Sequence, residues 1–217
     1  MNTHTNTAPV TTGGDTATTA DAMLDMAGFA MAFGAIQRAT LLPDGTTRED
    51  DATHTVMLGM IACSLAARFF PALDVGNVAQ YALVHDAPER YAGDVDTLTA
   101  TEDERAAKAA DEAAATDRID EEFGQTLPWL PNTIRAYESM ADPEARFVKA
   151  VDKLLPLLTE VLSGMAGTRR RGVDAAALAT HYDRQVDEIA LYASDFPVVF
   201  EVRRLLVAET LRILAAG

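Results

Sequence analysis

Residues 81–94 read YALVHDAPERYAGD, and this stretch decides how the rest of the chain is interpreted. A largely apolar run leads directly into His85 and Asp86. A buried imidazole beside a buried carboxylate costs desolvation free energy unless the two are paired or bind a cation. Imidazole nitrogen and carboxylate oxygen both bind divalent transition metals. The pair alone is more typical of a core histidine beside a helix-capping acid.

Two further residues of the same chemical types extend the pattern. His54 lies 31 residues before His85, near the start of the preceding predicted helix. Asp152 lies 66 residues after Asp86, in the segment FVKAVDKLL of residues 147–155. There the carboxylate falls among apolar residues in the middle of a predicted helix, where a charge needs a partner. The four residues together, rather than the pair, indicate a cation site.

Apolar residues recur at helical spacing along most of the chain, and no strand pattern is found. We expect one all-α domain, a helical bundle of seven or eight helices at residues 21–217, with a motif region at 25–165 and C-terminal helices within 173–215. Asp21 is expected to cap the first helix. The Thr-rich residues 1–20 predict a disordered tail. The expected helices are 22–38, 53–69, 74–86, 102–123, one from about 131, 143–165 with a kink at Pro156, 173–193 and 197–215.

Composition excludes several classes of protein. The formal net charge of −15 argues against a coat for long nucleic acid, which is held mainly by Lys and Arg. Residues 1–20 contain no basic or apolar run, so we expect no secretory signal and a cytoplasmic location. No window is predicted to span a membrane. The lone cysteine, Cys63, cannot form an intrachain disulfide and reads as a buried thiol.

The motif residues resemble the HD superfamily of metal-dependent phosphohydrolases. The pattern His … His-Asp … Asp on successive helices is similar to that of the superfamily. The segment at residues 85–94 resembles the His-Asp-Ala-x-Glu-x-x-x-Gly-Asp segment of the small bacterial 5′-deoxynucleotidases and related phage (d)NTP and (d)NMP hydrolases. The resemblance spans roughly residues 25–165. It implies hydrolysis of a nucleotide phosphate ester by a metal-activated water.

The resemblance also implies roles for individual residues. Glu89 matches the acid that orients or deprotonates the attacking water, and Asp94 matches a second acid near the leaving group. Arg38 matches an arginine that holds substrate phosphate from the first helix, and Lys153 is a further candidate phosphate contact. One divalent ion (Mn, Co, Mg, Fe, Ni or Zn) is expected on the matching ligands, which are His54, His85, Asp86 and Asp152.

The chain departs from the family's pattern at two positions. Thr53 stands where the family usually has Glu, directly before the first histidine. Because that Glu supports a metal ligand, the metal affinity is expected to be altered rather than lost. Ala39 stands where the family often has a bulky aromatic that helps reject a ribose 2′-hydroxyl. A preference for deoxyribose therefore does not follow from the sequence.

Several functions stay open at this stage. The substrate can be a nucleoside 5′-monophosphate that releases phosphate, or a dNTP that releases triphosphate. Hydrolysis of a signalling nucleotide such as (p)ppGpp and a non-catalytic HD binding module are alternatives. A di-iron oxygenase of this fold needs additional histidines, and residues 87–151 contain none.

The remaining polar residues and the C-terminal helix allow three further expectations. His181 is read as a surface histidine. The run of arginines at residues 169–171 is read as a solvated loop that could also reach a nucleotide or another subunit. We expect a homo-oligomer, a dimer or higher, with the apolar C-terminal helix as its interface.

Overall fold

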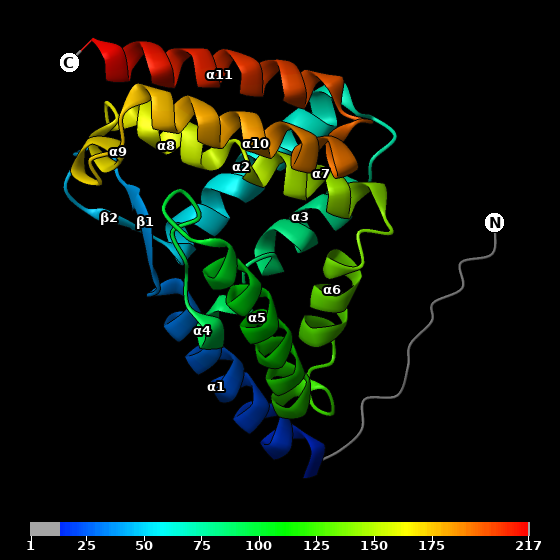
Figure 1. Cartoon of the computed structure of the whole chain (residues 1–217). Coiled ribbons are helices and arrows are strands. Elements are labelled where there is room, and N and C mark those ends of the chain that lie inside the picture. The colour runs from blue at the N-terminus through cyan, green and yellow to red at the C-terminus, as the bar shows by residue number, and fades with distance from the viewer. Residues whose placement is uncertain (1–13, 217) are drawn as a thin grey trace.

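A computed structural model describes residues 14–216 and shows an almost entirely helical domain (Figure 1). The all-α prediction is confirmed. Within the described residues, nine helices have eight residues or more, and two segments are shorter. The helices are α1 (Gly14–Gly34), α2 (Asp51–Phe69), α3 (Val75–Val84), α4 (Glu89–Ala92), α5 (Glu102–Phe123), α6 (Trp129–Glu138), α7 (Pro143–Asp152), α8 (Leu155–Leu162), α9 (Ala166–Arg170), α10 (Ala175–Ala193) and α11 (Pro197–Ala215).

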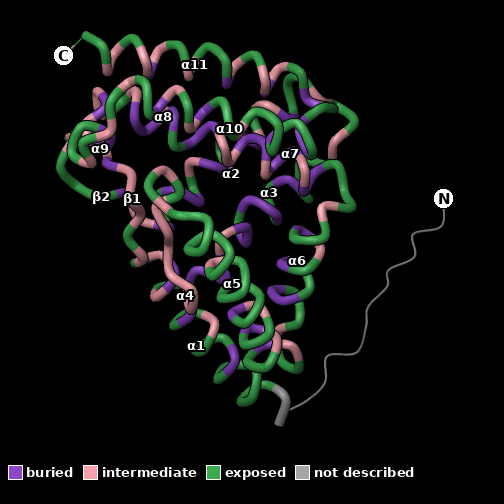
Figure 2. Tube along the Cα trace, in the orientation of Figure 1, coloured by how far each residue is buried: buried purple, intermediate pink, exposed green. Residues whose placement is uncertain are grey.

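The helices are arranged in two packed groups (Figure 1). In the larger group α2, α3 and α7 pack together, and α10 and α11 cover them. Its core includes Leu58, Phe147 and Val151, none of which is exposed to solvent. In the smaller group α1, α5 and α6 enclose Ile119 and Phe123. Buried residues run along the inner helices, whereas α5 and α11 are exposed along much of their length (Figure 2). The predicted metal ligands come from the buried helices.

Short side-chain signals set where several helices begin. The side chain of Asp74 accepts hydrogen bonds from the backbone N–H groups at the start of α3, as an N-cap residue does. Thr101 and Glu104 form a capping box at the start of α5, so each side chain bonds the other's backbone N–H. Pro143 occupies the first turn of α7, where its missing N–H costs nothing. These starts agree with the helices predicted there.

A two-stranded hairpin corrects the prediction that the chain contains no strands. Strands β1 (Gln37–Leu41) and β2 (Arg48–Asp50) pair antiparallel between α1 and α2. The turn between them is stabilised by Asp44, whose carboxylate accepts hydrogen bonds from the Thr46 and Thr47 N–H groups, and by Gly45 at a positive φ of 70°. The first helix ends at Gly34 rather than at residue 38. Arg38 therefore lies on β1 and not on the first helix.

Three other boundaries differ from prediction. Asp21 lies inside α1, which starts at Gly14, so residues 14–20 are helical and not part of a disordered tail. The rest of the predicted tail, residues 1–13, lies outside the described residues. Helix α7 ends at Asp152, and Pro156 lies in the first turn of a separate helix, α8, instead of kinking one continuous helix. The arginine run at 169–171, predicted to be a loop, forms the end of the short helix α9 and the residue after it.

Helix α2 is, among the described residues, the one helix long and apolar enough to cross a membrane by length and composition. The helix also carries the buried His54 and packs against α3 and α7. Core helices commonly have such a composition, so this finding is weak evidence for a membrane span.

Candidate metal centre and catalytic site

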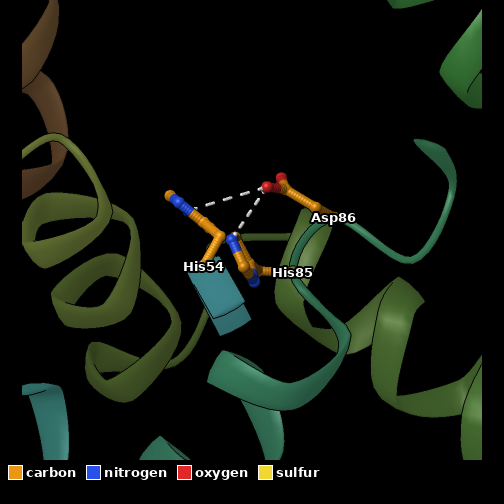
Figure 3. A group of neighbouring side chains, drawn as sticks. All are labelled: His54, His85 and Asp86. Atoms are coloured by element: carbon orange, nitrogen blue, oxygen red, sulfur yellow. Dashed lines mark ion pairs between the residues drawn. The ribbon is translucent and has the colours of Figure 1, made fainter. Parts of the chain in front are cut away.

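The four predicted metal ligands converge at one point in the fold. His54 comes from the first turn of α2, His85 and Asp86 follow α3, and Asp152 ends α7. Figure 3 shows His54 and His85 directed at Asp86. His85 Nε2 lies 2.9 Å from Asp86 Oδ2, and His54 Nε2 lies 3.1 Å from Asp152 Oδ1. The two crossed pairs, His54 with Asp86 and His85 with Asp152, are each 3.9 Å apart.

Hydrogen bonds at the far side of each imidazole determine which nitrogen faces this point. His54 Nδ1 lies 3.0 Å from Glu49 Oε1, and His85 Nδ1 lies 2.9 Å from the Ala82 carbonyl oxygen. Since both partners are acceptors, each Nδ1 carries the proton in the neutral ring. In this tautomer, which metal-binding histidines adopt, each Nε2 presents a lone pair towards the carboxylates. Burial opposes protonation of His54, but its hydrogen bonds to Asp152 and Glu49 raise its pKa to about 9, so a metal would replace a proton at His54 Nε2.

The spacing of the four ligand atoms fits a divalent ion. Atoms about 2.0–2.2 Å from a common ion lie roughly 3 Å apart at a right angle and about 3.4 Å apart at a tetrahedral angle. The observed separations of 2.9–3.9 Å cover this range. His85 Nε2 is fully buried and makes no hydrogen bond within residues 14–216, although Asp86 is close. A buried nitrogen so placed is suited to coordination.

The charges around the ligands favour ionised carboxylates. Burial opposes ionisation of Asp86, but the positive charges of His85 and Arg38 hold the pKa of Asp86 well below its usual range. The pKa of Asp152 is likewise lowered, by Lys153 and a hydrogen bond from His54, against the effect of burial. Both groups are therefore anionic near neutral pH, as metal ligands must be.

Comparison with known proteins agrees with this geometry. A model of the HD domain family matches residues 35–191, well over half of the chain. The chain belongs to the HD domain family. The solved structure of a predicted metal-dependent phosphohydrolase from Magnetospirillum magnetotacticum MS-1 is also similar, with 26% sequence identity and a TM-score of 0.71. The similarity covers 90% of this chain and 97% of that one. No curated protein matches.

These comparisons confirm the HD superfamily and support metal-dependent phosphohydrolase activity as a class. Within the described residues, His54, His85 and Asp86 form a cluster that could hold a metal ion. That these residues and Asp152 bind one stays a prediction. The narrower resemblance to 5′-deoxynucleotidases, the nucleotide substrate and the identity of the metal stay predictions.

Glu89 lies beside the ligands at the start of α4 and is only 2% exposed. Its Oε1 accepts a hydrogen bond from Lys108 Nζ at 2.9 Å, and its Oε2 makes no hydrogen bond within the described chain. Burial and the negative charge of Asp86 raise the pKa of Glu89 to about 8. A carboxylate with a raised pKa and one free oxygen can hold a water and accept its proton.

Arg38 reaches the centre from β1. Its Nη1 lies 2.8 Å from both Asp51 and Asp86 and 3.5 Å from Glu89. Its Nε and Nη2 make no hydrogen bond to residues 14–216. These nitrogens can donate to a phosphate while Nη1 stays anchored, because the guanidinium presents its donors in a planar fork.

Asp94 and Lys153 complete the set of predicted site residues. Asp94 Oδ2 accepts a hydrogen bond from the Ala39 N–H at 3.2 Å, which ties the segment after α4 to β1. Lys153 Nζ lies 3.2 Å from Asp152 Oδ2 and is about a third exposed, at 32%. Both line the same cavity as the ligands. Their catalytic roles remain predictions, as do those of the other residues of the site.

The structure adds two residues that sequence reasoning missed. Glu49 on β2 supports His54, the task expected of a Glu at position 53, while Thr53 itself is exposed. Thr40 Oγ1 in turn donates to Glu49 Oε2 at 2.5 Å. Lys108, from the charge-rich α5, pairs with Glu89. No local signal marks either residue, because each meets its partner only through packing of separate elements.

One cavity connects the metal centre with the C-terminal helices. It encloses about 990 Å³ between protein atoms, counting its open mouth. We call the end lined by His54, Asp86, Asp152, Arg38 and Glu89 the inner end. The opposite end is lined by residues of α8, α9 and α10, including Arg171 and His181. His181, expected at the surface, is half-buried and lines this cavity, and Arg171 also reaches it.

Proposed function

We propose that this HD domain hydrolyses the phosphate ester of a (deoxy)nucleoside 5′-monophosphate and releases phosphate. The observation that carries the proposal is the convergence of four ligand atoms with the buried Glu89 at the inner end of one cavity. A metal ion bound there lowers the pKa of a bound water and polarises a phosphoryl oxygen.

The residues around the ligands bind the phosphate and transfer protons. Arg38 donates to two phosphate oxygens, and Lys153 supports a third. Glu89 accepts the proton of the attacking water as its oxygen bonds to phosphorus. The bond between phosphorus and the ester oxygen then breaks, and the proton taken up by Glu89 passes to that leaving oxygen with the assistance of Asp94. The oxygen of the water thus ends in the phosphate, and one of its protons ends on the released nucleoside.

The charge of the cavity favours a monophosphate over a triphosphate. Four cations line it, and a divalent ion brings the positive charge to six. This equals the charge of the six carboxylates that line the same cavity when all of them are ionised. A monophosphate adds about two negative charges to this set and a triphosphate about four, so the triphosphate is the more costly to hold inside a partly buried site. The cations are Arg38, Lys108, Lys153 and Arg171, and the acids are Asp86, Glu89, Asp94, Asp96, Asp152 and Glu160.

Ala39 bears on the choice of sugar. It lines the cavity with a methyl group, and its N–H and carbonyl bond Asp94 and Arg171. A small side chain here leaves room for a ribose 2′-hydroxyl. We therefore propose that ribonucleotides and deoxyribonucleotides are both accepted.

A panel of nucleotides tests the proposed function. The purified protein is supplied in turn with Mn²⁺, Co²⁺ and Mg²⁺ and incubated with nucleoside monophosphates, dNTPs, (p)ppGpp and p-nitrophenyl phosphate. We expect phosphate from monophosphates, and no activity after chelation of the metal. Triphosphate release from dNTPs would replace the monophosphate proposal with the dNTPase alternative. No turnover of any nucleotide with any metal would contradict the function.

Partners and location belong to the proposal as well. We propose a cytoplasmic enzyme that binds neither long nucleic acid nor membrane and forms a homo-oligomer. The C-terminal helix α11, expected at the interface, exposes Leu205. Large exposed apolar residues are also found on α1 and α2, namely Met23, Leu24, Met31, Val56 and Met60. Light scattering of the protein, and of variants with charges on either surface, decides whether an oligomer forms and through which helices.

A further inference from the structure

The end of the cavity opposite the metal centre is lined mainly by apolar and neutral polar residues. We define the outer chamber by six residues from the segment after α4, from α8 and from α10: Leu98, Leu157, Leu178, His181, Tyr182 and Gln185. None of these residues belongs to the HD motif. Residues 155–193 carry five of the six, so the C-terminal part of the chain builds this chamber.

Apolar groups form much of the chamber wall. Leu157 and Leu178 are 3% and 1% exposed and belong to one buried cluster with Tyr182. The ring of Tyr182 adds a flat apolar surface. Binding sites for small organic molecules have this composition, with few polar groups among apolar walls. The chamber is therefore suited to a compact ring system rather than to a second phosphate.

The charged groups beside the chamber are already paired with one another. Arg171 Nη2 lies 2.6 Å from Glu160 Oε1, and Arg171 Nη1 lies 3.4 Å from Asp96 Oδ2. Glu160 is 5% exposed and also accepts a hydrogen bond from the Thr168 N–H. No cation lining this part of the cavity is left without an acid. A ligand group with a formal charge would have to break these ion pairs, so the chamber favours a neutral group.

Two neutral polar side chains remain available inside the chamber. Gln185 Oε1 accepts a hydrogen bond from Arg203 Nη2 at 3.2 Å. Because a guanidinium can only donate, this contact assigns the carbonyl oxygen to Arg203 and leaves the amide NH₂ directed elsewhere. That NH₂ makes no hydrogen bond to residues 14–216. Gln185 thus offers a donor whose orientation is set by its second contact.

His181 supplies the second polar group. Its ring nitrogens make no hydrogen bond within the described residues, and its ring packs edge-on against Tyr182. Burial, together with the positive charges of Arg184 and Arg203, lowers the pKa of His181. The neutral imidazole has one donor and one acceptor. It can therefore pair with a heterocycle edge that alternates carbonyl and N–H groups.

We propose that the outer chamber binds the nucleobase of the substrate and that Gln185 and His181 hydrogen-bond the base edge. This inference rests on the proposed nucleotide function and adds the residues that select the nucleoside. The base lies against Leu157, Leu178 and Tyr182, while its phosphate lies at the inner end.

The variant Gln185→Glu tests the proposal with minimal change in shape. A Glu side chain keeps an oxygen for Arg203 but replaces the amide donor with an acceptor. We expect KM for nucleoside monophosphates to rise about fivefold or more, the value of one lost hydrogen bond, with kcat nearly unchanged. The loss should be largest for guanine and thymine, which carry a carbonyl oxygen where adenine and cytosine, respectively, carry an amino group. p-Nitrophenyl phosphate, which has no base, should be hydrolysed as by the parent protein.

Controls separate this inference from the function it rests on. Asp187→Asn changes an exposed residue of the same helix and should leave every constant unchanged. Should Gln185→Glu fail to fold, His181→Ala provides the same comparison. Unchanged KM for all nucleotides, or an equal loss on p-nitrophenyl phosphate, would overturn the nucleobase subsite. If the parent protein hydrolyses p-nitrophenyl phosphate but no nucleotide, the proposed function fails instead.

Discussion

The inner end and the outer chamber of the cavity differ in almost every respect. The inner end is built from ionisable residues of α2 and α7 and of the segments beside them and beside α3, and it is dominated by His54, Asp86 and Asp152. The outer chamber comes largely from α8 and α10 and presents leucines with two neutral polar groups, His181 and Gln185. Charge is thus concentrated where a phosphate ester would react, and neutral surface where the rest of the substrate would lie.

The difference shows that metal coordination and recognition of a neutral ring restrict the choice of amino acids to different degrees. Coordination and proton transfer require particular atoms within about 3 Å of one another, so few residue types are suitable. Recognition of a neutral ring requires only shape and a donor or acceptor, which many residues can supply. A motif can therefore reveal the inner end, but no short motif marks the outer chamber. Four substitutions test this division, from the largest expected effect to the smallest.

Asp86→Ala should abolish activity on every substrate. The change removes a metal ligand and leaves Arg38 without one of its acidic partners. We expect kcat/KM to fall at least about a thousandfold, equally for nucleotides and p-nitrophenyl phosphate, and bound metal to be lost in elemental analysis. Asp195→Ala, at an exposed residue, is the control. Retention of metal by the Asp86 variant would contradict the assigned ligand set.

Glu89→Gln should slow the chemical step without loss of metal. The amide keeps the shape of the side chain but cannot accept the proton of the attacking water. Removal of a general base lowers kcat by about 10²–10⁴-fold. Steady-state kinetics with p-nitrophenyl phosphate and with nucleotides should show the same factor. A fall in kcat restricted to nucleotides would break the division between the two ends.

Glu49→Gln should weaken metal binding while the ligands stay in place. Glu49 bonds the outer nitrogen of His54, and loss of its charge reduces the basicity of the inner nitrogen. We expect the metal Kd to rise about tenfold, measured by titration of the metal-free protein. Thr53→Ala, at the exposed position where the family has its Glu, should bind metal normally. The reverse result would mean that position 53 still acts on the metal centre.

His181→Asn should change how the free energy of unfolding depends on pH below about neutrality. This is the smallest effect in the series. The lowered pKa of His181 means that the unfolded chain binds a proton more readily than the folded one. Stability therefore falls as pH drops below the ordinary value of 6.5, and the fall continues until the folded pKa is passed. Removal of the group should reduce this fall. Thermal unfolding between pH 8 and pH 5 would show parallel curves for both proteins if His181 were not held neutral.

Much of the helical order could be predicted because its signals are local. The end of α5 at Phe123, and the capping of α3 by Asp74, depend on residues a few positions apart. The hairpin that carries Arg38 was missed because its strands have three and five residues, too short for an alternating pattern. They are held by pairing between Gln37 and Asp50 across the turn, and no single segment records that pairing.

The candidate site divides in the same way. The sequence pattern grouped His54, His85, Asp86 and Asp152, because a cation site needs His and Asp in apolar surroundings, and the resemblance to the HD superfamily added Glu89 and Asp94. The structure brings these residues together, and their roles stay predictions. Packing alone placed Glu49 behind His54, Lys108 against Glu89, and His181 in a cavity wall. Each of these contacts joins separately formed elements, and a charged or polar residue looks the same in the sequence whether it faces solvent or a neighbouring helix.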